Sequence, residues 1–138
     1  MRVDNWDTKL SDYIQKQQQI KFRYGNADCV NFVLGAIETI TGKIVFDMEY
    51  KSIKEAKKII NDLNKKDLLD IAVDIGKTNK FKEIDCVYAQ RGDVVFFKTK
   101  EELGGTLGVC IGQKSIFRAK NGVETRDTNS CNFAWRIE

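Results

Sequence analysis

The hydrophobic pattern of this 138-residue chain changes near residue 84. Before that point, apolar residues recur every three or four positions, which is the spacing of the buried side of an amphipathic helix. After it, apolar residues form short runs rich in β-branched and aromatic side chains, and Gly, Lys or Asn separates one run from the next. Helices followed by strands predict an α+β domain, in which a helix packs on one face of a sheet.

Four helices are predicted in the first half of the chain. Each begins after a residue whose side chain can accept a hydrogen bond from a free backbone N–H group. The first helix is expected to end near Gln18 and the second at Gly42. The second helix has apolar residues on both faces and is therefore expected to be central. The predicted helix starts are Asp4 or Asp7, Asp28, Ser52 and Asp67.

The second half of the chain predicts an antiparallel meander, either as a sheet or as a small curled barrel. Its strands are short and follow one another through tight turns, as in consecutive antiparallel neighbours. We therefore expect one domain over residues 1–138, with a helical part at about 1–80 packed on a strand-rich part at about 84–138. The predicted strands are 93–97, 106–112, 115–119, 122–126 and 132–138.

Composition excludes several classes of protein. Hydrophobic residues make up 42% of the chain, which is enough to form a core. The 23 basic and 20 acidic residues are too evenly balanced for a nucleic-acid-binding surface, and the clustered lysines alternate with carboxylates. No apolar run is long enough to span a membrane, and the N-terminal residues show no secretory signal. We therefore expect no bound nucleic acid, no membrane span and no secretion by a signal peptide.

Four cysteines, at positions 29, 86, 110 and 131, bear on the possible chemistry. None forms a CxxC pair and the chain has no histidine, so no metal site is expected and no cofactor is implied. A chain without a secretory signal is expected to keep its thiols reduced. The sequence therefore predicts no disulfide, with Cys86, Cys110 and Cys131 as small buried residues.

Cys29 differs from the other cysteines because it follows a glycine turn and begins an apolar helical segment, "KFRYGNADCVNF" (21–32). A helix N-terminus stabilises a thiolate, so this position suits a nucleophile. Asp28 opposes that role with its negative charge, and no histidine is present to take the thiol proton or to protonate a leaving amine. Cys29 is thus either a candidate nucleophile or a small residue that packs the helix against the sheet.

Three motifs resemble those of NlpC-type cysteine peptidases, a papain-like family that cleaves bacterial cell-wall peptides. They occur in the same order as in that family. The second departs from the family pattern because Arg91 stands where the peptidases have proline. The motifs are "FRYGNADCVNF" (22–32), "QRGDVVFF" (90–97) and "TLGVCIGQKSIF" (106–117).

A closer resemblance extends over nearly the whole chain. It is to uncharacterised proteins that phages and prophages encode near their tail genes. The shared features are Trp6 and the segments "YGNADCVNF" (24–32), "YAQRGDVV" (88–95), "LGVCIG" (107–112) and "AWR" (134–136). The resemblance implies a papain-like, NlpC-like fold, with Cys29 in the first turn of the central helix and packed against strands 93–97 and 106–112.

The resemblance also implies roles for individual residues. Cys29 corresponds to the peptidase nucleophile, and Thr106 stands where the peptidases carry their histidine base. Threonine cannot take a proton from a thiol near neutral pH, so Thr106 is not competent as that base. The polar residue that orients the base falls near Phe117 or Arg118. Phe22 replaces a tyrosine that helps to line the peptidase site, and it lacks the hydroxyl group.

These observations leave two main functions open. The first is a catalytically degenerate structural or assembly protein of the phage virion or tail, which binds other virion proteins or a cell-wall peptide without cutting it. The second is a thiol-dependent hydrolase of cell-wall peptides that uses Cys29 with a base other than histidine or one lent by a partner. The first implies a location in the virion tail, or in the host cytoplasm during assembly. A regulatory domain of a prophage is a third alternative.

Overall fold

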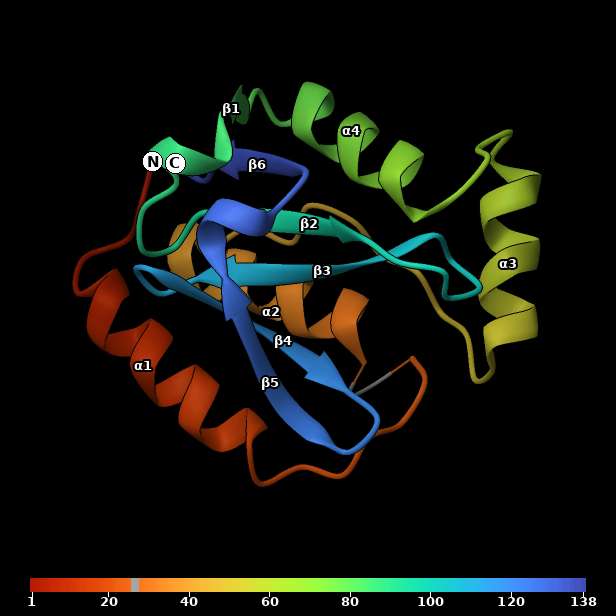
Figure 1. Cartoon of the computed structure of the whole chain (residues 1–138), viewed down its shortest axis with the longest axis horizontal. Coiled ribbons are helices and arrows are strands. Elements are labelled where there is room, and N and C mark those ends of the chain that lie inside the picture. Colours follow the sequence, from red (N-terminus) through yellow and green to blue (C-terminus); the bar gives the residue numbers. More distant parts are fainter. Residues whose placement is uncertain (26–27) are drawn as a thin grey trace.

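Helices and strands are segregated along the chain in the computed structural model, which describes residues 1–25 and 28–138 (Figure 1). The α+β class expected from the change in pattern near residue 84 is confirmed. The described helices are α1 (Trp6–Gln17), α2 (Cys29–Thr41), α3 (Ile53–Asp62) and α4 (Leu68–Thr78).

Three of the predicted helix starts are confirmed by their hydrogen bonds. The side chains of Asp28, Ser52 and Asp67 each accept from the backbone N–H group three residues further on. Each therefore satisfies one of the N–H groups that a helix leaves free at its first turn. The prediction also holds for Gly42, which ends α2 in the left-handed conformation that glycine adopts without strain.

The predicted start of α1 at Asp4 or Asp7 is wrong. The residue before the helix is Asn5, which has a left-handed backbone (φ 58°) and makes no capping hydrogen bond through its side chain. Asn tolerates this conformation better than most residues. Asp7 instead lies in the first turn of α1, where its negative charge interacts favourably with the helix dipole.

Six antiparallel strands form one sheet in the order β1-β6-β2-β3-β4-β5. The expected meander is confirmed for β2 to β5, but β6 returns to pair with the outer side of β2. The described strands place β1 and β5 at opposite edges, so the sheet is open and the curled-barrel alternative is wrong. The strands are β1 (Lys82–Ile84), β2 (Val94–Lys98), β3 (Gly105–Cys110), β4 (Lys114–Ala119), β5 (Gly122–Asp127) and β6 (Phe133–Arg136).

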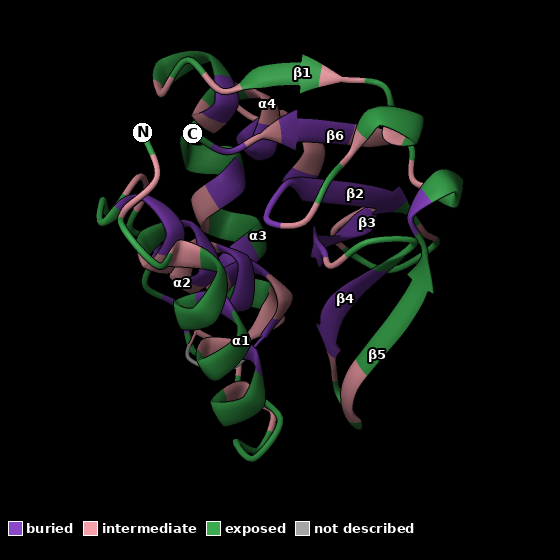
Figure 2. Ribbon diagram, turned by 90° about the vertical axis from the view of Figure 1, so that its left-hand side faces the viewer, coloured by how far each residue is buried: buried purple, intermediate pink, exposed green. Residues whose placement is uncertain are grey.

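The main core lies between the sheet and the helices, which gather on one side of it (Figure 2). Helix α2 is the central element, as expected, and seven of its residues are buried. It packs on β3 and β4, with α1 beside it. Cys29 lies in the first turn of α2, as expected, and interacts with Thr106 and Leu107 of the predicted strand 106–112. Helix α2 as a whole has β4, not β2, as its second main neighbour in the sheet. Fully buried side chains of this core include Leu10, Phe32, Ile40, Leu68, Phe96 and Val109.

The opposite face of the sheet carries a smaller core, centred on Val95 and Phe97. Two 3-10 turns cover it, η1 (Cys86–Tyr88) and η2 (Thr128–Ser130). Cys86 of η1 forms a disulfide with Cys131, which follows η2, and their Cα atoms are 5.9 Å apart. The prediction of no disulfide is therefore wrong. It relied on the missing secretory signal, whereas the packing of η1 against η2 brings these thiols together.

The two ends of the chain meet at Asp93, whose side chain is fully buried. Its carboxylate accepts hydrogen bonds from the Gln90 backbone (2.8 Å) and from the guanidinium groups of Arg136 (3.0 Å) and Arg2 (3.4 Å). The bond to the Gln90 backbone holds the turn before β2. Asp93 also ties residues near both termini to the start of β2.

Candidate functional site

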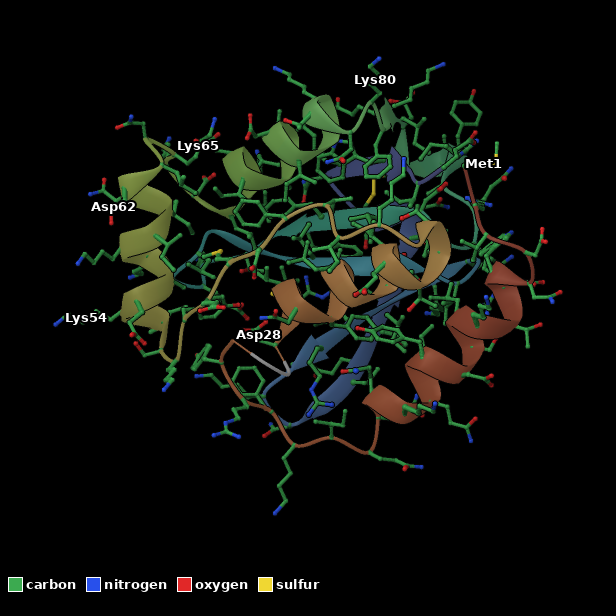
Figure 3. All side chains as sticks on the ribbon, turned by 180° about the vertical axis from the view of Figure 1, so that it is seen from behind. Met1, Asp28, Lys54, Asp62, Lys65 and Lys80 are labelled. Carbon is green, nitrogen blue, oxygen red and sulfur yellow. A yellow bond between two sulfur atoms is a disulfide. The ribbon has the colours of Figure 1, made fainter. Side chains whose placement is uncertain are left out.

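A cleft of about 480 Å³ lies at the N-terminal end of α2. We call it the Cys29 cleft, because it brings together Cys29 and Thr106, the two positions that the sequence indicated. The N-terminal end of α2, marked by Asp28 in Figure 3, forms one wall, and the β4–β5 hairpin and the β2–β3 loop contribute others. Further lining residues are Phe22, Tyr24, Tyr50, Glu101, Arg118 and Arg126.

Asp28 fixes the position of Cys29 at the start of α2. Its carboxylate is buried and accepts hydrogen bonds from the backbone N–H groups of Gly25 (2.8 Å) and Asn31 (2.9 Å) and from the Asn31 side chain (3.0 Å). The hydroxyl group of Tyr50 also donates to it. Burial, followed by the effect of Asp28, raises the pKa of Tyr50 and keeps this hydroxyl protonated. The carboxylate is therefore occupied in holding the turn and the helix start.

The environment of Cys29 opposes ionisation of its thiol. Burial is the main cause that raises the pKa of Cys29, and the negative charges of Asp28 and Glu101 raise it further. The Leu107 backbone and the Thr106 hydroxyl act in the opposite direction but do not outweigh burial. Since the thiolate is the reactive form, a thiol held neutral at physiological pH is a poor nucleophile.

This environment predicts a low reactivity for Cys29. We expect iodoacetamide at pH 7 to alkylate Cys29 more slowly in the folded protein than in urea, because the raised pKa lowers the fraction of thiolate. Below the thiol pKa the thiolate fraction, and with it the alkylation rate, rises with pH, and this rise should continue to higher pH in the folded protein than in urea. Mass spectrometry of the peptides distinguishes Cys29 from Cys110, the other free cysteine among the described residues. Faster alkylation in the folded state would instead indicate an activated thiolate.

Thr106, which the resemblance places where the peptidases carry their base, has a side chain that cannot do that chemistry. Thr106 is buried on β3, next to Phe97 of β2, and its hydroxyl interacts with the Cys29 thiol. Phe22, at the position of a peptidase tyrosine, packs edge-on against Tyr24 at 4.8 Å between ring centres. The described site thus has the predicted cysteine, and the side chain beside it on β3 is a threonine, which does not act as a general base.

Arg118 and Tyr50 contribute to the cleft in ways that the sequence did not indicate. Arg118 lies near the position of the orienting residue, but its guanidinium donates to the backbone carbonyls of Gln17 (2.6 Å) and Ile20. Tyr50 comes from the segment between α2 and α3, which has no periodic pattern and no recognisable motif. No local sequence pattern indicates the role of Tyr50, because that role depends on contact with Asp28, 22 positions away.

Two further findings concern metal binding and membrane spans among the described residues. No group of three or more His, Cys, Asp or Glu side chains among them is arranged to hold a metal ion. No described helix has the length and apolar character needed to cross a membrane.

The described residues thus define an α+β domain with a cleft that contains a cysteine but no histidine. The chain belongs to a family described as a domain of unknown function (DUF6950), whose pattern matches residues 1–137. A comparison with curated proteins gives no match.

Proposed function

We propose that this protein is a catalytically degenerate NlpC-like domain that serves as a structural or assembly component of a phage tail or virion. The observation that carries the proposal is the pairing of Cys29 with Thr106 in the cleft. Cysteine is present at the start of the central helix, but the residue beside it cannot accept a proton, and burial raises the pKa of the thiol. When a nucleophile and a base act together in catalysis, loss of the base lowers the reaction rate by several orders of magnitude.

The arrangement of the fold supports the NlpC-like part of the proposal. A central helix that begins with cysteine packs on an antiparallel sheet, and the third motif supplies the strand, β3, that faces this cysteine. The three motifs also follow one another along the chain in the order that NlpC-type peptidases have. The phage-tail part is supported by the resemblance of Trp6 and four segments to proteins encoded near tail genes.

An assembly role requires surfaces that bind other proteins. Val87 and Tyr88 of η1 are 64% and 67% exposed, and the neighbouring disulfide holds this turn in place. Exposed aromatic residues are common anchors of protein interfaces. Helix α3 offers a charged surface, from which Lys54 and Asp62 point outward (Figure 3). Trp135 is not available for such a surface, because it is only 4% exposed and belongs to the core.

A second candidate function is a thiol-dependent hydrolase whose base comes from a partner. The observation that favours it is that Cys29 lines an open cleft large enough for several atoms of a peptide. In this case a partner side chain would enter the cleft next to Thr106 and remove the thiol proton.

The deciding experiment is complementation of a phage that lacks this gene with the Cys29→Ser form. Serine is nearly isosteric with cysteine, so we expect normal particle assembly and normal infectivity if the protein acts as a scaffold. A Tyr88→Ser form alters an exposed aromatic outside the cleft and tests whether assembly depends on that surface. Loss of infectivity by Cys29→Ser, in correctly assembled particles that contain folded protein, would refute the scaffold proposal and favour the hydrolase.

A further inference from the structure

Arg118 is a buried cation without an anionic partner in the described part of the chain. Its side chain projects from β4, and the residue is 3% exposed. No carboxylate within residues 1–25 and 28–138 forms a salt bridge with it. A buried charge that lacks both a counter-ion and a full set of hydrogen bonds is unfavourable, so native proteins rarely retain one without a function.

The hydrogen bonds of Arg118 satisfy only part of its guanidinium group. Two nitrogens donate to the carbonyls of Gln17 and Ile20, at the C-terminal end of α1, where the helix dipole is negative. Its Nε–H group is buried and has no acceptor among the described residues. The contacts with α1 therefore explain how Arg118 is held, but they leave the Nε–H donor without an acceptor and supply no carboxylate counter-charge.

Two further cations of the β4–β5 hairpin line the Cys29 cleft. Lys120 lies in the β4–β5 turn, and Arg126 lies on β5 with its guanidinium 5.2 Å from the centre of the Phe117 ring. We call Arg118, Lys120 and Arg126 the hairpin end of the cleft. Glu124 is the only carboxylate that this hairpin adds to the described cleft lining, so three cations and one anion give a net charge of +2.

The acidic side chains of the cleft lie mainly on a different element. Glu101 and Glu102 belong to the β2–β3 loop, which reaches toward α3 (Figure 1). A salt bridge of 3.3 Å between Glu102 and Lys57 joins that loop to α3. The sign of the charge therefore changes along the cleft. The hairpin end is positive, and the end formed by the β2–β3 loop is negative.

We propose that the hairpin end of the Cys29 cleft is a carboxylate-binding subsite, in which Arg118 receives the acidic group of an extended peptide. A planar guanidinium matches the geometry of a carboxylate, and the bound anion supplies the missing counter-charge. Phe22, Tyr24 and Phe117 line the same cleft and provide apolar surface for the rest of the peptide. The inference deepens the proposed function, because it rests on the cleft acting as a binding groove without cleavage.

The test is a titration of the isotopically labelled full chain with sodium acetate at constant ionic strength, followed by NMR of the arginine Nε–H groups. We expect a saturable shift of the Arg118 resonance with acetate and none with acetamide, a neutral molecule of similar shape. Arg2 and Arg136 are internal references, since their Nε–H groups already donate to Ile137 (2.8 Å) and Asp93 (3.0 Å). Acetyl-Ala-Ala with a free carboxylate should bind more tightly than acetate, because its remaining atoms contact the aromatic wall.

A pair of lysine variants provides a further comparison that does not disturb the contacts of Arg118 with α1. Lys120→Gln should weaken acetate binding by about fivefold, since an exposed ion pair contributes up to about 1 kcal/mol. Lys114→Gln alters an exposed lysine of the same strand pair outside the cleft lining and should leave the affinity unchanged.

Several outcomes would overturn the proposal. These are an equal shift with acetamide, equal shifts at Arg2 and Arg136, or an affinity that Lys120→Gln and Lys114→Gln reduce alike. Tighter binding of phosphate than of acetate would assign the subsite to a phosphate group, and equal affinities for acetate and acetyl-Ala-Ala would exclude a peptide. The anion titration and the infectivity of the Cys29→Ser form are separate measurements, so failure of the anion subsite can be distinguished from failure of the scaffold proposal.

Discussion

Replacement of Asp93 by Asn is expected to lower the free energy of unfolding by about 3 kcal/mol, because it leaves two arginines without their shared counter-charge. The carboxylate is fully buried, whereas the side chains of Arg2 and Arg136 are 22% and 26% exposed. Partial access of water to the arginines places the loss at the lower end of the range for a broken buried ion pair. Urea unfolding followed by tryptophan fluorescence measures the change.

Asp127→Asn is the matched control for the Asp93 variant. Asp127 forms an ion pair of 2.6 Å with Lys114, but both side chains are more than half exposed. An exposed pair contributes at most about 1 kcal/mol, so the same chemical change should have a small effect here. Equal losses in the two variants would contradict the view that burial makes Asp93 important.

Reduction of the disulfide between Cys86 and Cys131 is expected to have the second large effect. The bridge closes a segment with a sequence separation of 45 residues. For a loop of about this length, the restriction of the unfolded chain stabilises the folded state by about 4 kcal/mol. We therefore expect dithiothreitol to lower the urea midpoint of the natural chain strongly. Intact mass should increase by two hydrogen atoms on reduction.

The double variant Cys86→Ala/Cys131→Ala separates loss of the bridge from other effects of the reductant. Its stability should be close to that of the reduced natural chain, and dithiothreitol should not change it. A freshly purified chain that gains no mass on reduction would show that the thiols are not joined. Equal sensitivity of the double variant to dithiothreitol would show that the reductant acts elsewhere.

Local signals predicted much of the secondary structure. Asp28, Ser52 and Asp67 start helices as expected, because a capping side chain acts on a backbone N–H group only three positions away. The same approach failed where the local chemistry was weaker. Asn5 begins α1 through its backbone conformation alone, and the edge strand β1 has no apolar run because its three residues are largely exposed.

The site was predictable only in part. Cys29 and Thr106 could be matched because each lies in a recognisable segment, and the described cleft brings both to its surface. Tyr50 and the unmatched donor of Arg118 could not be anticipated. Their roles depend on which distant groups reach them, namely the Asp28 carboxylate for Tyr50 and the end of α1 for Arg118.

The sequence by itself determined the α+β class and the absence of an imidazole base, because periodicity and composition can be read without knowing any contact. Only the tertiary structure decided which cysteines pair, how deeply Asp93 is buried and what surrounds Cys29. These features join residues 45 positions apart in the disulfide and 91 positions apart between Arg2 and Asp93. Contacts over such separations follow from how the helices and strands pack together, and no local pattern in the chain encodes them.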